Sequence, residues 1–251
     1  MELNIKNITF VIVTFKSEKV IFDCLNSLPK ESPKIIIENS NNKNLKEELN
    51  LKYDNIEVIL SENLGMGTSN NIGLRNCKTQ FAFVLNPDTK LEKNCLNEII
   101  KSSVFIKDFS IISPISSDSN YLNYLGEEKN FSINENIISV NHVDGFSMLF
   151  NREKFKSQDY FDENFFLFLE NNDLCLRVKK RNEKIFIIKS SKIDHLRAKA
   201  VDNKYSIEIE YLRNWHWMWS KFYFNKKHYG YPKALLKSLP TLITYIIKFF
   251  F

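Results

Sequence analysis

Short runs of apolar, β-branched residues alternate with segments of helix length through the first half of the chain. The clearest run is residues 8–14 (ITFVIVT), which is typical of a strand buried on both faces of a sheet. Further strands are predicted at residues 34–37, 56–60 and 81–85. Strands that are separated by helices pair in parallel through right-handed crossovers. The alternation therefore predicts an α/β fold with a mostly parallel central sheet flanked by helices.

Helical patterns lie between these strands, and the regular alternation of strands and helices ends in the second half of the chain. Ser17 is a predicted N-cap of a helix that ends near Leu28, and residues 67–77 and 91–103 are predicted helices. The elements predicted after these are a loop at 113–119, strands at 121–125, 131–140, 143–150 and 185–188, and helices at 171–181 and 206–224. No linker, repeat or low-complexity segment divides the chain, which favours one domain with a C-terminal appendage.

Composition excludes several classes of protein. The 251 residues are 43% hydrophobic and 26% charged, so the chain can bury a substantial core, and disordered or disulfide-scaffold classes are excluded. The net charge of +5 is mild, and the first 200 residues contain no concentrated basic stripe, so no nucleic-acid partner is expected. The four cysteines form no CxxC pair, which is typical of free thiols in the cytoplasm. The amino-terminal segment reads as a strand rather than a signal peptide.

Polar residues follow each of the first four predicted strands. These residues are Thr14, Glu38-Asn39, Glu62-Asn63 and Asn86-Pro87-Asp88. Because the carboxyl ends of parallel strands meet at one edge, and open α/β sheets bind ligands there, we expect a binding site at this edge. The alternative is that each strand simply ends in a polar residue, which is less satisfactory for four strands together than for one.

Five segments, taken in order, resemble a family 2 glycosyltransferase of the rhamnosyltransferase-like branch. They are VIVTFKS at 11–17, ENS at 38–40, NLGMGTSNNIG at 63–73, LNPDT at 85–89 and FDENFFLFLENNDLCLRVKKR at 161–181. The resemblance covers most of residues 8–200 and implies a GT-A fold, which is Rossmann-like, with a C-terminal helical appendage. It implies a catalytic domain at 1–204, divided into a nucleotide-sugar half at 1–110 and an acceptor half at 111–204. Residues 205–251 form the aromatic and basic helical segment.

The resemblance also implies which residues contact the nucleotide-sugar donor. These are Thr14, Phe15, Glu38, Asn39, Asn63, Gly67, Asn71, Asn86 and Asp88. Glu38 stands where the family commonly has Asp, so the usual geometry is in doubt there. Gly67 and Asn71 belong to a loop-to-helix turn, where small residues allow close backbone approach and exposed N–H groups favour an anion. Turn chemistry alone would also account for the glycine.

Asn86-Pro87-Asp88 occupies the position of the family's DxD motif, which holds Mg²⁺ or Mn²⁺ against the diphosphate. Asp88 is the sole carboxylate of the motif here, and the alternative is that it caps the helix predicted to begin near Leu91. His195 stands where relatives often have a histidine that approaches the metal or the diphosphate. A surface or core histidine is the alternative, with Arg197 and Lys199 contacting the diphosphate instead.

The catalytic base is expected in the stretch Glu170-Asn171-Asn172-Asp173, where the family usually has ED-x-D. Asn171 replaces an Asp and cannot accept a proton near neutral pH, which leaves Asp173 and Glu170. An inverting transferase needs one carboxylate to take the proton from the acceptor hydroxyl. The alternative for Asp173 is a structural ion pair with Arg177, four residues on. Asp144 is a candidate acceptor contact.

The C-terminal segment combines tryptophan and phenylalanine with lysine. Residues 215–251 are interrupted by Pro240 and Lys248, so a transmembrane span is not expected. Aromatic residues beside lysines suit peripheral contact with the cytoplasmic face of a membrane. The alternative is a helix packed on the catalytic domain or on a second subunit in a homodimer.

These expectations combine into a metal-dependent, inverting glycosyltransferase. It would transfer a sugar, rhamnose being the one that the resemblance suggests, from a nucleotide diphosphate donor to a glycan or lipid-linked acceptor in cell-surface polysaccharide synthesis. Asn86 and Asn171 motivate an alternative, a catalytically weakened nucleotide-sugar-binding protein on the same fold. A sugar nucleotidyltransferase is disfavoured because no Gly-rich basic loop follows the first strand.

Overall fold

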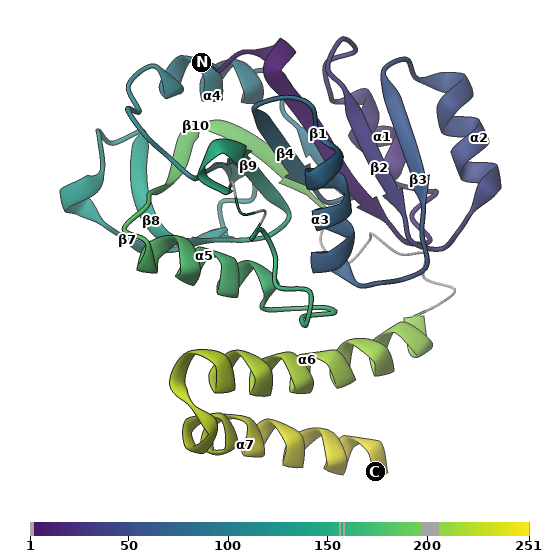
Figure 1. Cartoon of the computed structure of the whole chain (residues 1–251), viewed down its shortest axis with the longest axis vertical. Coiled ribbons are helices and arrows are strands. Elements are labelled where there is room, and N and C mark those ends of the chain that lie inside the picture. Colours follow the sequence, from purple (N-terminus) through teal and green to yellow (C-terminus); the bar gives the residue numbers. More distant parts are fainter. Residues whose placement is uncertain (1–2, 156, 158, 197–205, 251) are drawn as a thin grey trace.

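The computed structural model of the chain describes residues 3–155, 157, 159–196 and 206–250 (Figure 1). The strands are β1 (Ile8–Thr14), β2 (Lys34–Glu38), β3 (Ile56–Leu60), β4 (Phe81–Leu85), β5 (Thr89–Leu91), β6 (Ile111–Ser116), β7 (Tyr124–Glu127), β8 (Ile137–Val143), β9 (Ser147–Asn151) and β10 (Ile185–His195). The helices are α1 (Ile21–Asn26), α2 (Lys43–Lys52), α3 (Met66–Asn76), α4 (Cys95–Ser103), α5 (Glu170–Lys180), α6 (Ser206–Tyr229) and α7 (Tyr231–Phe250).

Within the described residues the strands form one mixed sheet in the order β3-β2-β1-β4-β9-β6-β10-β8-β7, with β5 paired to β10. The first half is parallel, since β1 pairs in parallel with β2 and β4, and β2 with β3. The second half is largely antiparallel, because β9 runs against both β4 and β6, and β8 runs against β10. The parallel sheet predicted for the first half is confirmed, and it brings the carboxyl ends of four strands to one edge.

Helices cover both faces of the sheet (Figure 1). Apolar residues of β1 alternate between two cores: Phe10 and Ile12 belong to the core shared with α1, α2 and α4, whereas Val11 and Val13 belong to the core shared with α3 and α5. All seven residues of β1 are buried. A strand apolar on both faces can be satisfied only by helices on both faces, which explains the continuous apolar run in the sequence.

Several predicted elements were wrong in their bounds or type. The first helix begins at Ile21, because the Ser17 hydroxyl accepts a hydrogen bond from the N–H of Phe15 (3.1 Å) instead of capping. Leu91 lies in β5, and α4 begins only at Cys95, so Asp88 does not cap it. The predicted loop at 113–119 overlaps β6. Pro114 pairs with Ile188 of β10, but the pairing of β6 with β9 ends at Ile112, so on the β9 side no ladder N–H is needed from the proline.

Helices α6 and α7 form an antiparallel hairpin below the sheet in Figure 1, on the side of α3 and α5. Gly230 joins them with φ of +87°, a left-handed conformation that suits glycine. The predicted helix at 206–224 extends to Tyr229. Among the described residues, no helix combines the length and apolarity needed to cross a bilayer. The boundary expected at 204–205 lies outside the described residues.

The four cysteines are buried and free, one at or within each of four sheet-flanking helices. Cys24 lies in α1, Cys95 begins α4, Cys175 lies in α5 and Cys77 follows the end of α3. Burial disfavours the thiolate and raises the pKa of Cys24, Cys95 and Cys175 to about 12, and that of Cys77 to about 11. Thiols in this state are poor metal ligands and poor nucleophiles.

Candidate active site

A cleft of about 600 Å³ opens at the carboxyl ends of the parallel strands and extends to helix α6. The predicted site residues that line it are Phe15, Asn39, Asn63, Asn86, Asp88, Glu170 and His195. They follow β1, β2, β3 and β4, begin α5 or end β10, so the expected convergence at this sheet edge is confirmed. Thr14, Glu38, Gly67, Asn71 and Asp173 do not line the cleft.

Asp88 and His195 meet because β5 pairs with the end of β10, where His195 lies opposite Thr89. The N–H of Leu196 also donates to the carbonyl of Asp88 (3.0 Å). His195 Nε2 lies 3.4 Å from Asp88 Oδ1, and its ring stacks on Phe146 with centroids 4.2 Å apart. Backbone pairing and ring stacking therefore hold the carboxylate and the imidazole together.

The Asp88–His195 pair fits a divalent cation that shares its remaining ligands with a substrate. Within the described residues, Asp88 Oδ1 and His195 Nδ1 are buried and make no hydrogen bond, although Asp88 Oδ1 keeps its 3.4 Å contact with His195 Nε2. Such orphaned polar atoms are costly unless a ligand or solvent satisfies them. The described part of the chain has no cluster of three or more His, Cys, Asp or Glu residues suited to a metal. One carboxylate and one imidazole suit Mg²⁺ or Mn²⁺, which bind few protein ligands besides substrate phosphates and water.

Glu170 is the first residue of α5 and lines the cleft. Its Oε2 atom is buried and has no hydrogen-bond partner within the described residues. Burial disfavours the ionised form and raises the pKa of Glu170 to about 7. A carboxylate with a pKa near neutrality suits proton transfer in either direction at physiological pH.

Asn171 ties the start of α5 to the neighbouring strand β8. Its Nδ2 lies 3.1 Å from His142 Nε2 and donates to the carbonyl of Val143 (3.2 Å). His142 and Asp144 both line the cleft, with His142 Nδ1 4.0 Å from Asp144 Oδ1. Burial lowers the pKa of His142, so the imidazole is neutral near pH 7. The amide at position 171 therefore holds the start of α5 against β8.

Asp173 lies beneath the cleft in a buried ion cluster. Its side chain is fully buried and is contacted by Arg177 Nε (2.8 Å), Lys227 Nζ (2.6 Å) and His228 Nε2 (2.8 Å). The ion pair expected between Asp173 and Arg177 is present. Two of the three cationic or donor groups come from α6, so the cluster joins α5 to the C-terminal hairpin.

The donor side of the cleft is shaped by the turn into α3. Gly65 has φ of +86°, and a Cβ atom there would lie 2.3 Å from the carbonyl oxygen of Phe166. The N–H of Met66 donates to the same oxygen (2.8 Å), so this N–H is taken by the protein rather than left for an anion. Asn39 accepts a hydrogen bond from Ser69 (2.9 Å), which holds its side chain at the cleft. The α3 turn thus supports the segment that leads to Glu170.

The predicted donor residues outside the cleft have structural partners. Thr14 Oγ1 donates to the carbonyl of Ile37 (3.5 Å), and Glu38 accepts from the N–H groups of Ser40 and Asn42 to close the turn before α2. The Asn71 amide is paired with the backbone of Phe161, donating at 2.8 Å and accepting at 3.0 Å. Its neighbour Asn70 lines the cleft instead, with a buried Oδ1 that has no partner in the described residues.

Helix α6 contributes cleft residues that the sequence analysis missed. Leu212, Arg213 and Trp217 line the cleft, and Trp217 meets Phe168 edge-on with ring centroids 5.5 Å apart. The spacing of 213 and 217 by one helical turn is the available signal, but sequence alone does not say what this face meets. Arg197 and Lys199, predicted alternatives for the diphosphate, lie outside the described residues.

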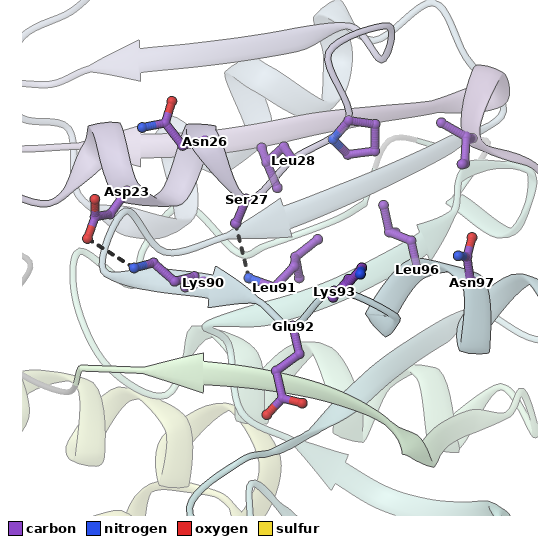
Figure 2. A pocket seen from close by; sticks show the side chains of 12 residues that line it. Asp23, Asn26, Ser27, Leu28, Lys90, Leu91, Glu92, Lys93, Leu96 and Asn97 are labelled. Carbon is purple, nitrogen blue, oxygen red and sulfur yellow. Dashed lines mark hydrogen bonds and ion pairs between the residues drawn. The ribbon is translucent and has the colours of Figure 1, made fainter.

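A second hollow, of about 580 Å³, lies between α1 and the segment from β5 to α4. Figure 2 shows Lys90 pointing to Asp23 and Ser27 pointing to the backbone of Leu91. These contacts, 3.1 Å each, fasten β5 to α1. The hollow contains none of the predicted site residues, and its interactions serve to hold β5, which in turn carries Asp88 toward His195.

Comparisons with known proteins agree with this architecture. Solved structures with similar folds include GalNAc-T7 with UDP, GalNAc and Mn²⁺, with a TM-score of 0.63 at 14% identity, covering 76% of this chain and 44% of that one. The mannosyltransferase PcManGT from Pyrobaculum calidifontis, with GDP-Man and Mn²⁺, gives a TM-score of 0.61 at 10% identity, covering 95% of this chain and 74% of that one. The chain thus spans less than half of GalNAc-T7, and these likenesses show a GT-A fold.

Sequence comparison is more specific. A relative from Haloferax volcanii, described as low-salt glycan biosynthesis hexosyltransferase Agl10, is 26% identical over 222 residues, which are 78% of this chain and 68% of the relative. Residues 9–170 match the family described as glycosyl transferase family 2, and they contain Asp88, the α3 turn and the start of α5. This match spans more than half of the chain, which is therefore a glycosyltransferase and belongs to glycosyl transferase family 2.

Proposed function

We propose that the chain transfers a sugar from a nucleoside diphosphate donor to an acceptor hydroxyl inside the 600 Å³ cleft. One observation carries the proposal: Asp88 and Glu170 line the same cleft, and a buried carboxylate oxygen of each, Asp88 Oδ1 and Glu170 Oε2, makes no hydrogen bond in the described residues. One comes from the parallel half of the sheet and the other from the start of α5. Two carboxylates in different surroundings suit two roles, ligand binding and proton transfer.

The donor lies over the carboxyl ends of β1 to β4 in this proposal. Phe15, Asn39 and Asn63 offer an aromatic face and amide groups for the base and ribose. The relatives with bound UDP or GDP-Man and the hexosyltransferase relative support a nucleotide sugar as donor. Rhamnose is the sugar that the motif resemblance suggests, and it is the first to test.

Asp88 and His195 would hold Mg²⁺ or Mn²⁺ beside the diphosphate. When bound, the cation would offset the negative charge that develops on the departing nucleoside diphosphate, an effect of several kcal/mol. Phe146 keeps the His195 ring in place by stacking, and the pairing of β10 with β5 keeps Asp88 beside it. Both side chains are therefore positioned before the donor arrives.

Glu170 acts as the general base. As the acceptor hydroxyl oxygen bonds to the anomeric carbon, the bond from that carbon to the diphosphate breaks, and the hydroxyl proton passes to the Glu170 carboxylate. Displacement from the opposite face inverts the anomeric centre. We assign this role to Glu170 rather than Asp173, because Asp173 is fully buried in an ion cluster outside the cleft. Asp144, also in the cleft, is placed to contact the acceptor.

The acceptor is a glycan or lipid-linked glycan in cell-surface polysaccharide synthesis, and the protein reaches it at the cytoplasmic face of the membrane. The α6–α7 hairpin supports this part of the proposal. It exposes Trp215, Trp219, Leu235, Leu236, Leu239 and Ile243. We call these six residues the hairpin surface. Exposed apolar patches of this kind mark sites of membrane or protein contact.

A donor screen tests the proposed function. UDP-, GDP- and dTDP-linked sugars, dTDP-rhamnose among them, are incubated with the protein and Mn²⁺ or Mg²⁺, and released nucleoside diphosphate is measured with matched calorimetric titrations. We expect one donor to bind and to be turned over faster when an acceptor is added. Binding with no turnover in any combination would support the nucleotide-sugar-binding protein instead. No binding of any donor would contradict both.

A further inference from the structure

We propose that helix α6 is a positioning element for Glu170, acting through Ser220, Tyr223 and His228 on the segment from Asp162 to Asp173. The inference rests on the proposed role of Glu170 as the base. It makes the C-terminal hairpin part of the catalytic machinery rather than an attachment to it.

The backbone that precedes Glu170 is strained. Phe168 and Leu169 have φ of 70° and 64°, so two consecutive residues with bulky side chains are left-handed. Such a backbone conformation is unfavourable for residues with bulky side chains and persists only where surrounding contacts enforce it. Leu169 also serves as the N-cap of α5 without a side-chain cap, so its conformation directs the helix on which Glu170 lies. Something outside this segment must hold it.

Helix α6 makes a direct hydrogen bond to the backbone of the strained segment. Ser220 is fully buried, and its Oγ donates to the carbonyl of Leu167 at 2.7 Å. The carbonyl before it, that of Phe166, accepts from the N–H of Met66 at 2.8 Å. Successive carbonyls are therefore fixed from opposite sides, by α6 and by the turn into α3. These two contacts define the path of the chain into Phe168 and Leu169.

A second contact set fixes the two ends of the segment. At its start, Asp162 Oδ2 accepts from Tyr223 (2.9 Å) and contacts Lys227 Nζ (2.6 Å). At its end, Asp173 Oδ1 accepts from His228 (2.8 Å) and also contacts Lys227 (2.6 Å). The single Lys227 ammonium thus joins both carboxylates. Because Asp173 lies three residues after Glu170 in α5, the α6 contacts fix the rotation of the turn that carries the base.

Aromatic side chains of the segment before Glu170 also pack against α6. Phe165 meets Tyr223 edge-on at 4.8 Å between ring centroids, and Phe166 stacks on His216 at 4.1 Å. Phe168 meets Trp217 at 5.5 Å. Aromatic residues along the segment therefore contact side chains of α6 in addition to the polar contacts. Contacts of this kind can hold the Glu170 carboxylate in place to within a fraction of an ångström. A misplacement of about 1 Å can lower the rate about 10²-fold.

Hydrogen–deuterium exchange of the full chain tests the support independently of activity. In Ser220→Ala the bond to Leu167 is lost, and in His228→Leu the bond to Asp173 is lost. We expect amides of residues 165–170 to exchange at least about 10-fold faster in both variants, because local opening of this segment becomes easier. The matched control is Asn225→Ala, which removes a buried side chain whose Nδ2 donates to the carbonyl of Lys221 within α6 (2.7 Å). Exchange in that variant should match the wild type at 165–170.

Kinetics test the catalytic consequence. We expect Ser220→Ala and His228→Leu to lower kcat roughly 10-fold or more while the dissociation constant for donor stays within about twofold, because the donor side of the cleft is intact. His228→Gln, which keeps an N–H near the position of Nε2, should recover much of kcat. Tyr223→Phe offers a third, nearly isosteric loss of one bond if His228→Leu fails to fold. Asn225→Ala should keep the wild-type kcat.

The possible outcomes separate the inference from the proposed function. Unchanged exchange at 165–170 in the folded Ser220, Tyr223 and His228 variants would overturn the positioning role whatever the enzyme's activity. Faster exchange with an unchanged kcat would also overturn it, since the segment would then be held without benefit to the chemistry. A wild-type protein that binds no donor would contradict the proposed function, and the exchange result would still decide whether α6 holds the segment.

Discussion

His195 Nε2 lies 3.4 Å from Asp88 Oδ1, and this contact exists because the end of β10 pairs with the short strand β5. Asp88 and His195 lie far apart in the sequence, and no local sequence pattern links them. Both side chains line the cleft, and the proposed function assigns the cation to them. The first prediction follows from this pair.

Asp88→Asn should remove the enhancement of donor binding by metal. The amide keeps the shape of this buried side chain, whereas the loss of charge removes the carboxylate that a hard cation prefers. Calorimetric titration of nucleoside diphosphate with and without Mn²⁺ measures the effect. Asp194→Asn, the same change at an exposed position beside His195, is the control and should bind as the wild type does. Equal metal enhancement in wild type and Asp88→Asn would remove Asp88 from the metal site.

Glu170→Gln and Asp173→Asn should fail in different ways. We expect Glu170→Gln to lose about 10²–10⁴-fold in kcat while it still binds donor, because only proton transfer is removed. Asp173→Asn should lower the free energy of unfolding by about 1–3 kcal/mol, since Arg177 and Lys227 lose a buried carboxylate partner, and should lower kcat only about 10-fold, through the α6 contacts that position Glu170. Urea denaturation and turnover, measured on both variants, separate the two effects. Full turnover in Glu170→Gln would point to Asp144 as the next candidate base.

The raised pKa of Glu170 predicts two dependences on pH. Turnover should rise as pH increases through about 7, because the carboxylate must be ionised to accept a proton. Stability should move the other way. The folded state holds the proton up to about pH 7, whereas the unfolded chain releases it near 4.5, so stability is lost as pH rises between these values, by up to about 3 kcal/mol.

Glu170→Gln removes this titration and gives the matching control. Its free energy of unfolding should equal that of the wild type near pH 4 and exceed it near pH 8. Urea denaturation at both pH values measures the difference. If the free energies of unfolding of the wild type and the variant differ by the same amount at both pH values, Glu170 titrates normally in the folded protein.

Gly65→Ala and Gly230→Ala form a matched pair of substitutions at left-handed glycines. At Gly65 an added Cβ would lie 2.3 Å from the carbonyl oxygen of Phe166, whereas at Gly230 it would meet nothing within 4 Å. We expect about 1 kcal/mol of destabilisation at Gly230, from backbone strain alone, and about 2–4 kcal/mol at Gly65. Urea denaturation measures both. Equal losses would mean that the turn into α3 relaxes away from Phe166 at little cost.

The hairpin surface should bind anionic vesicles. Binding should weaken with salt, because each lysine near the lipid surface contributes up to about 1 kcal/mol that screening removes, yet persist through the apolar residues. Leu236→Glu, at a side chain 76% exposed on α7, should reduce co-sedimentation, whereas Leu51→Glu, 90% exposed on α2, should not. An unbound wild type that sediments as a dimer would show that a second copy covers this surface.

The sequence predicted the parallel half of the fold because each signal there is local. Strand β1 is apolar on both faces, and the polar residues at the strand ends converge by the geometry of parallel pairing alone. The cleft positions of Phe15, Asn39 and Asp88 follow from that rule. Adjacent positions are harder: Asn71 was predicted in the site but faces Phe161, whereas Asn70 lines the cleft. A one-residue rotation of a helix is not specified by motif spacing.

The second half of the fold depends on contacts between distant segments, which no local pattern encodes. Residues 113–119 were predicted as a loop, yet β6 runs to Ser116, and the partial pairing with β9 that tolerates Pro114 is visible only in the sheet. The ion pair of Asp173 with Arg177 was predictable from helical spacing, but Lys227 and His228 reach it from α6. The contribution of α6 to the cleft was missed for the same reason.

The reactivity of the four buried cysteine thiols reports local opening of the folded protein. Each sulfur is shielded beside a different sheet-flanking helix, and a raised thiol pKa makes each slow to react with alkylating reagents while its helix stays docked. Pulsed alkylation followed by peptide mapping would therefore show, in a single experiment, the order in which the helices undock from the sheet. Early labelling of Cys175 ahead of Cys24 would show that the largely antiparallel half of the sheet loosens while the parallel half is still closed.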